Sequence, residues 1–287
     1  MINMRYTKDD LDKQFPYDVS CLDLIFKNRY GDLEACPKCG VLEPKFYHVK
    51  LRKSYACKDC GYQLNPLAGT IFHKSSTPLR KWFYAMYLFS ISKNGVSALE
   101  LQRHIGVSYP TAHRMEKQIR LLMADDTNRL GKGGEPKQMD ETYYGGRRKQ
   151  SKSYDNKVPI LGVLQQGGKV KVAVTGSARG KDAMEFLKAN VVEGAILHTD
   201  ESKIYTQAHK HYLHQSVRHV SKQWVENGVH TNGIEGFWSQ LKRSLDGTYH
   251  AVSPYYLQSY VNEFAYRYNN RNVAIFPLLI SKAVKPF

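Results

Sequence analysis

Two pairs of cysteines place the strongest constraint on how this chain can fold. Cys36 and Cys39 lie in the stretch CPKCG, Cys57 and Cys60 lie in CKDCG, and 17 residues separate the two pairs. This spacing is typical of a structural zinc site in which four thiolates surround one Zn²⁺ ion. The residues between the pairs are rich in β-branched and aromatic side chains, which favour strands. We therefore predict a zinc ribbon at residues 31–66.

Disulfide bonds and a redox pair are the alternative interpretations of these cysteines. The first residues, MINMRYTKDDLDKQF, are charged and do not resemble a secretory signal. No run of about 18 apolar residues predicts a transmembrane helix. We therefore expect a cytoplasmic protein with no membrane partner, in which disulfide bonds are disfavoured. A single redox pair would leave the other pair unexplained, and Cys21, in an amphipathic stretch, is expected to be a buried apolar side chain.

The chain is strongly basic. Its formal net charge is +16, from 42 Lys and Arg against 26 Asp and Glu. A globular protein with this charge usually binds a polyanion, most often nucleic acid. An anionic membrane surface is less favoured because no basic amphipathic helix is evident. A basic surface without any polyanionic partner is the remaining alternative.

A second DNA-binding unit is predicted at residues 67–130. Ser97 is expected to cap a short helix that runs to His104, and a turn at IGVS separates it from a longer helix that Ser108 caps. A short helix, a turn containing glycine and a second basic helix are typical of a helix-turn-helix. An ordinary helical hairpin is the alternative. We expect the second helix to present to DNA the residues Tyr109, Thr111, His113, Arg114 and Lys117.

The pattern changes after the linker stretch GKGGEPK, and we assign residues 135–287 to a catalytic domain. Strands and helices are expected here in the order β-β-β-α-β-α-β-α, which is the layout of a ribonuclease H-like α/β domain. Such a domain has a mixed five-stranded sheet with helices. An N-terminal helical arm at residues 1–30 completes the predicted organisation.

Three acidic residues are expected to meet in this domain. Asp140 lies inside the first predicted strand, Asp200 ends the fourth, and Glu235 lies on the helix after the fifth. In a ribonuclease H-like sheet the first and fourth strands are neighbours, and this helix packs across their ends. Because carboxylates are costly in central strands, we predict that they hold two Mg²⁺ (or Mn²⁺) ions about 4 Å apart for in-line phosphoryl transfer. Surface acids without a cation are the alternative.

The predicted helix in HTNGIEGFWSQLKRSLDGTYH has two distinct faces. Its polar face carries Asn232, Glu235, Ser239, Lys242 and Asp246. Its apolar face carries Ile234, Phe237, Trp238, Leu241 and Leu245. We expect the apolar face to anchor the helix to the sheet and the polar face to line the metal site. Lys242 lies two turns beyond Glu235, where it is placed to hold a phosphate beside the metals.

Several stretches together resemble a known family. They are CPKCG with CKDCG, GTIFHKSSTPLRKWF, MDETYYGGRRK, HTDESKIY, HTNGIEGFWSQLKR, GTYHAVS and YVNEFAYRYNNR, and they extend from about residue 20 to residue 275. The chain is similar to the D-D-E transposases of bacterial insertion sequences, specifically the zinc-ribbon group related to Merlin elements (the ISXO-type group). The resemblance implies an enzyme that binds terminal inverted repeats, cleaves the element ends and joins the 3′ ends to target DNA.

The resemblance also implies roles for individual residues. Asp140 and Asp200 match the first two catalytic acids, Glu235 follows Asp200 at a spacing of 35, and Lys242 is the basic residue that follows the third acid. Some members of the group use Asn or His in the third position, so Asn232 is the alternative third ligand. Charge favours Glu235 because a carboxylate holds Mg²⁺ better than an amide.

The implied partners are double-stranded DNA, both end and target, and at least one further copy of the chain in the synaptic complex. The implied location is the bacterial cytoplasm, on the nucleoid. The basic stretch after the first strand suits contact with the DNA backbone and contains Arg147, Arg148 and Lys149. A solvated loop is the alternative for that stretch. A ribonuclease H-like nuclease and a non-catalytic DNA-binding regulator remain the alternative functions.

Overall fold

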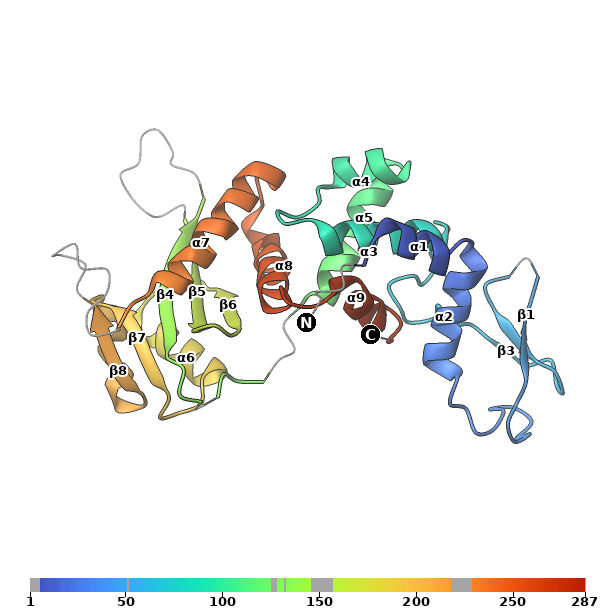
Figure 1. Cartoon of the computed structure of the whole chain (residues 1–287), viewed down its shortest axis with the longest axis horizontal. Coiled ribbons are helices and arrows are strands. Elements are labelled where there is room, and N and C mark those ends of the chain that lie inside the picture. The colour runs from blue at the N-terminus through green and yellow to red at the C-terminus, as the bar shows by residue number, and fades with distance from the viewer. Residues whose placement is uncertain are drawn as a thin grey trace. The chain divides into compact units, whose positions relative to one another are not determined.

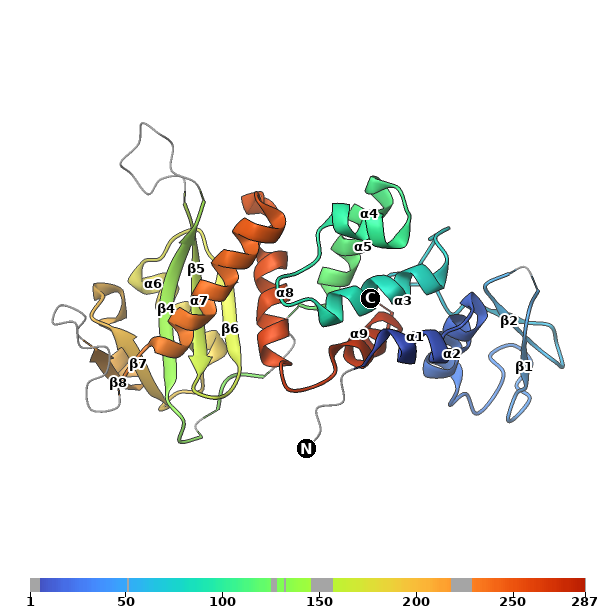
Figure 2. The ribbon, with the colours of Figure 1, turned by 45° about the horizontal axis from the view of Figure 1, so that its top comes forward.

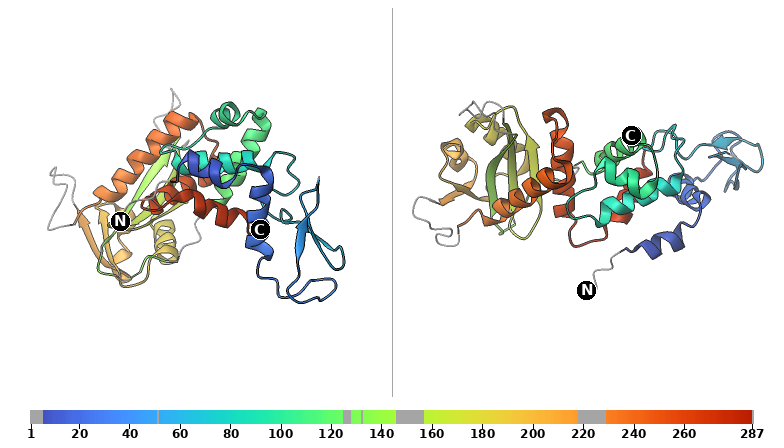
Figure 3. Two further views of the ribbon diagram at one scale, coloured as in Figure 1. Left: turned by 45° about the vertical axis from the view of Figure 1, so that its right-hand side comes forward. Right: turned by 90° about the horizontal axis from the view of Figure 1, so that it is seen from above.

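The computed structural model describes residues 6–50, 52–124, 128–131, 133–145, 157–217 and 229–286. The chain divides into two compact units, one made of Met1–Leu122 with Asn272–Phe287 and the other of Met123–Arg271, and both can be followed in Figure 1, Figure 2 and Figure 3. Arg147, Arg148 and Lys149, the predicted backbone contacts, lie outside the described residues. Within the described ranges, no helix is long and apolar enough to cross a membrane.

Two helices and a three-stranded antiparallel sheet begin the first unit. The helices are α1 (Lys8–Gln14) and α2 (Asp18–Tyr30). The strands, in the order of their pairing, are β1 (Phe46–His48), β2 (Tyr55–Cys57) and β3 (Gln63–Leu64). Phe26 of α2 stacks on Tyr55 of β2 with 4.0 Å between the ring centroids, and the Tyr55 hydroxyl donates a hydrogen bond to Asp23. Helix α2 therefore packs on the predicted ribbon strands.

Three helices follow in the same unit. They are α3 (Leu79–Ile91), α4 (Ala98–Ile105) and α5 (Tyr109–Leu122). The hydroxyl of Ser97 accepts a hydrogen bond from the N–H of Glu100 and so caps α4 as predicted. Gly106 ends α4 in the left-handed conformation, with φ of 64°, which a residue without a Cβ adopts at little cost.

The last helix of the chain, α9 (Ile275–Ala283), also belongs to the first unit. Phe276 stacks on Tyr6 at 4.5 Å and makes edge contacts with Phe15 and Phe83. The predicted catalytic domain of residues 135–287 therefore extends too far, because this apolar helix finds its aromatic partners in the N-terminal part of the chain. That pairing is non-local, and no periodicity in the sequence reveals it.

The second unit contains a mixed five-stranded sheet. Its strands are β4 (Lys137–Tyr144), β5 (Val158–Gln165), β6 (Val170–Val174), β7 (Ile196–Asp200) and β8 (Leu213–Val217). Their order in the sheet is β6-β5-β4-β7-β8. The first three strands pair antiparallel, whereas β7 is parallel to both β4 and β8. The α/β class, the five strands and the adjacency of the first and fourth strands agree with the prediction.

Helices cover both faces of this sheet (Figure 2). They are α6 (Gly180–Asn190), α7 (Asn232–Ser244) and α8 (Leu257–Asn269). On the α6 face, Met139 and Leu161 pack with Leu187 in one apolar cluster. On the other face, Ile160 packs with Trp238 and with side chains of α8 in a second cluster. Side chains alternate along β4, so neighbouring residues serve opposite clusters.

One element of the predicted order differs in the structure. The helix expected between the fourth and fifth strands of this domain is replaced by two single 3₁₀ turns, Lys203–Tyr205 and Ala208–Lys210. The connection from β7 to β8 is short, and the turn buries Tyr205 against the sheet.

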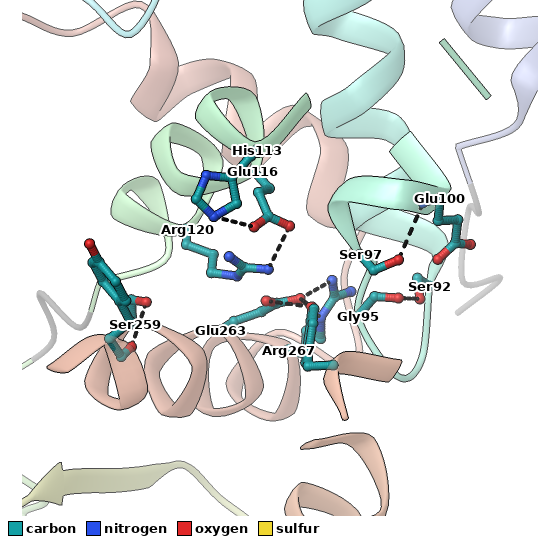
Figure 4. Close-up of polar contacts among 12 residues, drawn as sticks. Ser92, Gly95, Ser97, Glu100, His113, Glu116, Arg120, Ser259, Glu263 and Arg267 are labelled. Atoms are coloured by element: carbon teal, nitrogen blue, oxygen red, sulfur yellow. Dashed lines mark hydrogen bonds and ion pairs between the residues drawn. The ribbon is translucent and has the colours of Figure 1, made fainter. Parts of the chain in front are cut away.

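Within α8, Glu263 and Arg267 form a buried ion pair at 2.6 Å, visible in Figure 4.

Candidate functional site

The four predicted zinc ligands meet at one point in the first unit. The Sγ atoms of Cys36, Cys39, Cys57 and Cys60 all lie within 4.8 Å of one another, and those of Cys36 and Cys60 are 3.8 Å apart. Tetrahedral zinc with bonds of about 2.3 Å separates its sulfur ligands by roughly 3.8 Å. The arrangement therefore fits one structural Zn²⁺ ion.

The backbone around these cysteines is shaped for metal binding. Gly40 and Gly61 follow the second cysteine of each pair with φ near 70°, where a Cβ would be strained. The N–H groups of Cys39 and Lys38 point at the sulfur of Cys36 and lower the pKa of its thiol to about 6. A thiolate is thus favoured at neutral pH before a metal binds.

The sheet register brings the first two acids together in the second unit. As predicted, Asp140 lies within β4 and Asp200 ends β7. The two strands pair in parallel with Gln138 opposite His198. Extending that register by two residues places Asp140 level with Asp200 and on the same face. Helix α7 covers this face of the sheet. Asp140 pairs with Gly162 of β5, and the ring of Trp238 in α7 lies directly over Gly162.

Glu235 lies in the first turn of α7. The helix packs on β4 and β5 through its apolar face, as predicted. The hydroxyl of Thr231 donates a 2.6 Å hydrogen bond to the Glu235 carboxylate, which orients that side chain at the start of the helix. The three acids thus come from two neighbouring strands and one helix.

The electrostatics at Asp140 show that these acids are neighbours. Burial and, to a smaller extent, the charges of Glu141, Asp200 and Glu235 raise the pKa of the Asp140 carboxyl to about 7. Within the described ranges, however, the four cysteines are the only group of three or more His, Cys, Asp or Glu whose ligand atoms all lie within 4.8 Å. The three carboxylates are therefore close without forming a closed ligand set.

Glu141 is an acid near the site that was not predicted. It alternates with Asp140 along β4 and faces the α6 side, where it accepts a 2.5 Å hydrogen bond from Tyr205. Burial raises the pKa of the Glu141 carboxyl, and the charge of Asp200 adds to that effect. The adjacent acids in MDET were a visible signal, but only the register assigns them to opposite faces.

Lys242 and Asn232 occupy different positions on α7. Asn232 is the first residue of the helix and is exposed. Lys242 lies about 10 Å further along the helix axis than Glu235, at about 1.5 Å per residue. There it lines an open cavity of about 630 Å³ whose other lining residues are Tyr143, Tyr144, Gly145, Val158, Asp246, His250, Ala251, Val252 and Pro254.

The cavity floor has an unusual backbone. Helix α7 continues into a π-helical turn, Leu245–Tyr249, and the next residue, His250, has φ of 58°. A positive φ is uncommon for residues other than glycine, and π-helical turns are rare and concentrate at functional sites. Lys242 therefore faces a shaped cavity beyond the acids.

Two family models match the chain where these two sites lie. An ISXO2-like transposase domain matches residues 133–269, which contain all three acids, and a transposase zinc-ribbon domain matches residues 16–63, which contain all four cysteines. Together the matches cover well over half of the sequence. The chain belongs to the ISXO2-like transposases.

A relative of this transposase occurs in an archaeon. A protein described as an uncharacterized protein in transposable element ISH50, from Halobacterium salinarum, is 27% identical over 278 residues. That alignment covers 89% of the transposase and 92% of the relative. The zinc-ribbon match begins at residue 16 and so includes α2, in accord with the packing of α2 on β2.

Between the two matches, α5 carries the residues predicted to face DNA. Tyr109 and Arg114 are exposed, Thr111, His113 and Lys117 are half-buried, and the Tyr109 and His113 rings stack at 5.9 Å.

Polar partners hold several of these side chains. Arg114 donates to the carbonyl of His73 at 3.2 Å. His113 lies 3.7 Å from Glu116, which forms a buried ion pair with Arg120 (Figure 4). Of the five predicted residues, Tyr109 and Arg114 are exposed, and Arg114 is also held by a backbone carbonyl.

Proposed function

We propose that this transposase cleaves the ends of its element and joins the freed 3′ ends to target DNA at Asp140, Asp200 and Glu235. The observation that carries the proposal is the convergence of these acids at Asp140, whose pKa burial and the neighbouring charges raise to about 7. Grouped carboxylates that repel one another in this way are stabilised by divalent cations. The strand order and the position of α7 support a ribonuclease H-like catalytic domain.

The ligand atoms suit a hard cation. All three side chains offer carboxylate oxygens, which Mg²⁺ and Mn²⁺ prefer. When bound, two such ions supply the positive charge that stabilises in-line phosphoryl transfer. Asp140 must lose its proton for this role, and a bound cation favours that loss.

Glu235 is the third ligand that the contacts favour. Its charge acts on Asp140, and its carboxylate is held by the Thr231 hydroxyl. Asn232 is exposed at the first position of the same helix and carries no charge. Asn232 remains the alternative, and the amide variant of Glu235 separates the two.

Lys242 and its cavity are placed to receive the DNA strand. The ammonium is exposed two turns beyond Glu235 and lines the cavity with aromatic residues such as Tyr143. A cation beside a phosphate backbone gives affinity, and aromatic rings offer a surface on which bases stack. We assign Lys242 to a phosphate next to the scissile one.

The first unit is proposed to recognise the element ends. The zinc ribbon and a helix-turn-helix formed by α4 and α5 belong to it, and the chain as a whole has a net charge of +16. Tyr109 and Arg114 are its exposed candidate contacts. Joining two ends in one complex requires two active sites, so we propose at least a homodimer on DNA.

The test is a strand-joining assay with labelled DNA that contains the element ends. With Mg²⁺, the unaltered protein should give joined products, and Asp140→Asn, Asp200→Asn and Glu235→Gln should abolish them without loss of end binding. Asn232→Ala should retain them if Glu235 is the ligand. Cleaved but unjoined DNA would instead indicate a nuclease, and full activity of Asp200→Asn would overturn the proposal.

A further inference from the structure

A buried amide joins the strand that carries Asp140 to the helix that carries Glu235. Gln138 is fully buried, two residues before Asp140 on the same face of β4. Its Oε1 accepts hydrogen bonds from the backbone N–H groups of Gly233, at 2.8 Å, and Ile234, at 3.1 Å.

A third hydrogen bond of Gln138 is made by the nitrogen of its side-chain amide. Nε2 of Gln138 lies 3.1 Å from Nδ1 of His230. An amide nitrogen can only donate, so Nδ1 of His230 accepts and the proton of its neutral ring is on Nε2. Both ends of the amide therefore have defined partners close to the start of α7.

The start of α7 depends on this amide for its cap. The first N–H groups of a helix have no partner within it and need one from elsewhere. Thr231, at the N-cap position, makes no side-chain hydrogen bond to the backbone of the helix, because its hydroxyl donates to Glu235 instead. Gln138 of β4 therefore caps the start of α7 in place of a local side chain.

Two glycines let the helix approach the sheet closely at this point. A Cβ on Gly233 would lie 2.6 Å from Oε1 of Gln138 and 3.2 Å from Cδ2 of Leu164. On the strand side, a Cβ on Gly162, opposite Asp140, would lie 2.5 Å from the ring of Trp238. The helix is thus seated against β4 and β5 with no room for a methyl group.

We propose that Gln138 is a positioning residue that sets the distance between the Asp140 and Glu235 carboxylates. Gln138 lies two residues before Asp140 in β4. It also accepts a hydrogen bond from the N–H of Ile234, the residue before Glu235. The inference rests on the proposed function of these acids. Loss of the amide should release the start of α7 and move Glu235 away from Asp140.

The first experiment compares two glutamines that each join a helix to a strand. Gln258 of α8 accepts from the N–H of Val174 at 2.7 Å, away from the acids. Gln138→Met and Gln258→Met remove the same chemical group from the full-length, zinc-loaded protein. Mn²⁺ binding, followed by electron paramagnetic resonance, is measured with Asp140→Asn as the background.

We expect Gln138→Met to weaken Mn²⁺ binding roughly 10- to 100-fold, as removal of a ligand-supporting group does. Gln258→Met should leave it unchanged. Gln138→Glu keeps acceptor oxygens for both N–H groups and should restore most of the affinity. Without added cation, Gln138→Met should also speed amide hydrogen exchange at Gly233 and Ile234.

A second pair of variants guards against simple misfolding. Gly233→Ala places a methyl against Gln138, whereas a Cβ on Gly236, in the same helix, meets nothing within 4 Å. Gly233→Ala should weaken Mn²⁺ binding, and Gly236→Ala should not. Equal effects within this pair, or within the two glutamine variants, would overturn the positioning role.

The two proposals fail in distinguishable ways. If the unaltered protein binds no more Mn²⁺ than Asp140→Asn, the metal site itself is refuted, and the positioning role falls with it. If the unaltered protein binds Mn²⁺ but Gln138→Met matches Gln258→Met, only the role of Gln138 is refuted.

Discussion

The ring of Trp238 occupies the space that a side chain at Gly162 would need. A Cβ at residue 162 would lie 2.5 Å from two ring carbons of Trp238, in the strand pair that carries Asp140. The glycine is thus required for the helix that bears Glu235 to lie flat on the sheet. Its importance for this fold comes from close packing, since its backbone conformation is one that other residues adopt.

Replacing this glycine should destabilise the catalytic unit. We expect Gly162→Ala to lower the free energy of unfolding by about 1–3 kcal/mol, the usual cost of overpacking. Urea unfolding measures it. Gly176→Ala is the control, because a Cβ there would meet nothing within 4 Å. A loss of the same size in both variants would argue against the packing explanation.

Zinc binding should depend on four of the five cysteines. The purified protein should contain one Zn²⁺ per chain, and Cys57→Ser should reduce that amount and loosen the ribbon. Cys21→Ala should keep it, because the buried Cys21 thiol lies outside the group formed by the other four cysteines. Elemental analysis gives the metal content. Loss of zinc in Cys21→Ala alone would contradict the assignment.

The stability of the protein should fall with rising pH when no divalent cation is added. Burial raises the folded-state pKa of Asp140 from 3.8 to about 7, so the folded state binds more protons than the unfolded state between those values. Unfolding free energy is then lost as pH rises from about 4 to about 7, by up to about 4 kcal/mol.

Asp140→Asn is the matched variant for this measurement. It cannot ionise, so its urea unfolding should depend less on pH across the same range. Added Mg²⁺ should also reduce the loss in the unaltered protein, because the cation favours the ionised carboxylate. An identical pH dependence in both proteins would show that Asp140 does not titrate in this range.

Lys242 should affect strand joining more than its neighbour. Lys242 is assigned to a phosphate next to the scissile one, and a small misplacement of a substrate can cost about 10²-fold in rate, so we expect a loss of this order for Lys242→Ala. Arg243→Ala is the control, since Arg243 is exposed on the same helix but does not line the cavity. Single-turnover rates measure the difference. Equal rates in the two variants would remove Lys242 from the site.

The parts that could be predicted from the sequence are those that local spacing encodes. The cysteine spacing predicted the ribbon, and the predicted strands correctly placed Asp140 within a strand and Asp200 at a strand end. Helix periodicity predicted the apolar face of α7, which the packing confirms. Each of these signals lies within a short segment, of which the longest runs from Cys36 to Cys60.

What could not be predicted depends on contacts between distant residues. The partners of Gln138 in α7 are 95 and 96 residues away, and a buried glutamine in a strand has no sequence signal of its own. The side to which Glu141 turns follows from a register that only the paired strands define. In the sequence, helix α9 is only a short apolar segment. One of its packing partners, Tyr6, lies more than 250 residues earlier in the chain.

Helix α9 makes the first unit depend on residues that follow the second unit in the chain. Because Phe276 fills an aromatic cluster with Tyr6, Phe15 and Phe83, the first unit needs residues that are synthesised after all three acids. A copy of the element whose reading frame is interrupted after Arg271 would keep every acid, yet its first unit would lack part of its hydrophobic core. Such copies should therefore be inactive, because the part that is synthesised first could not complete its folding.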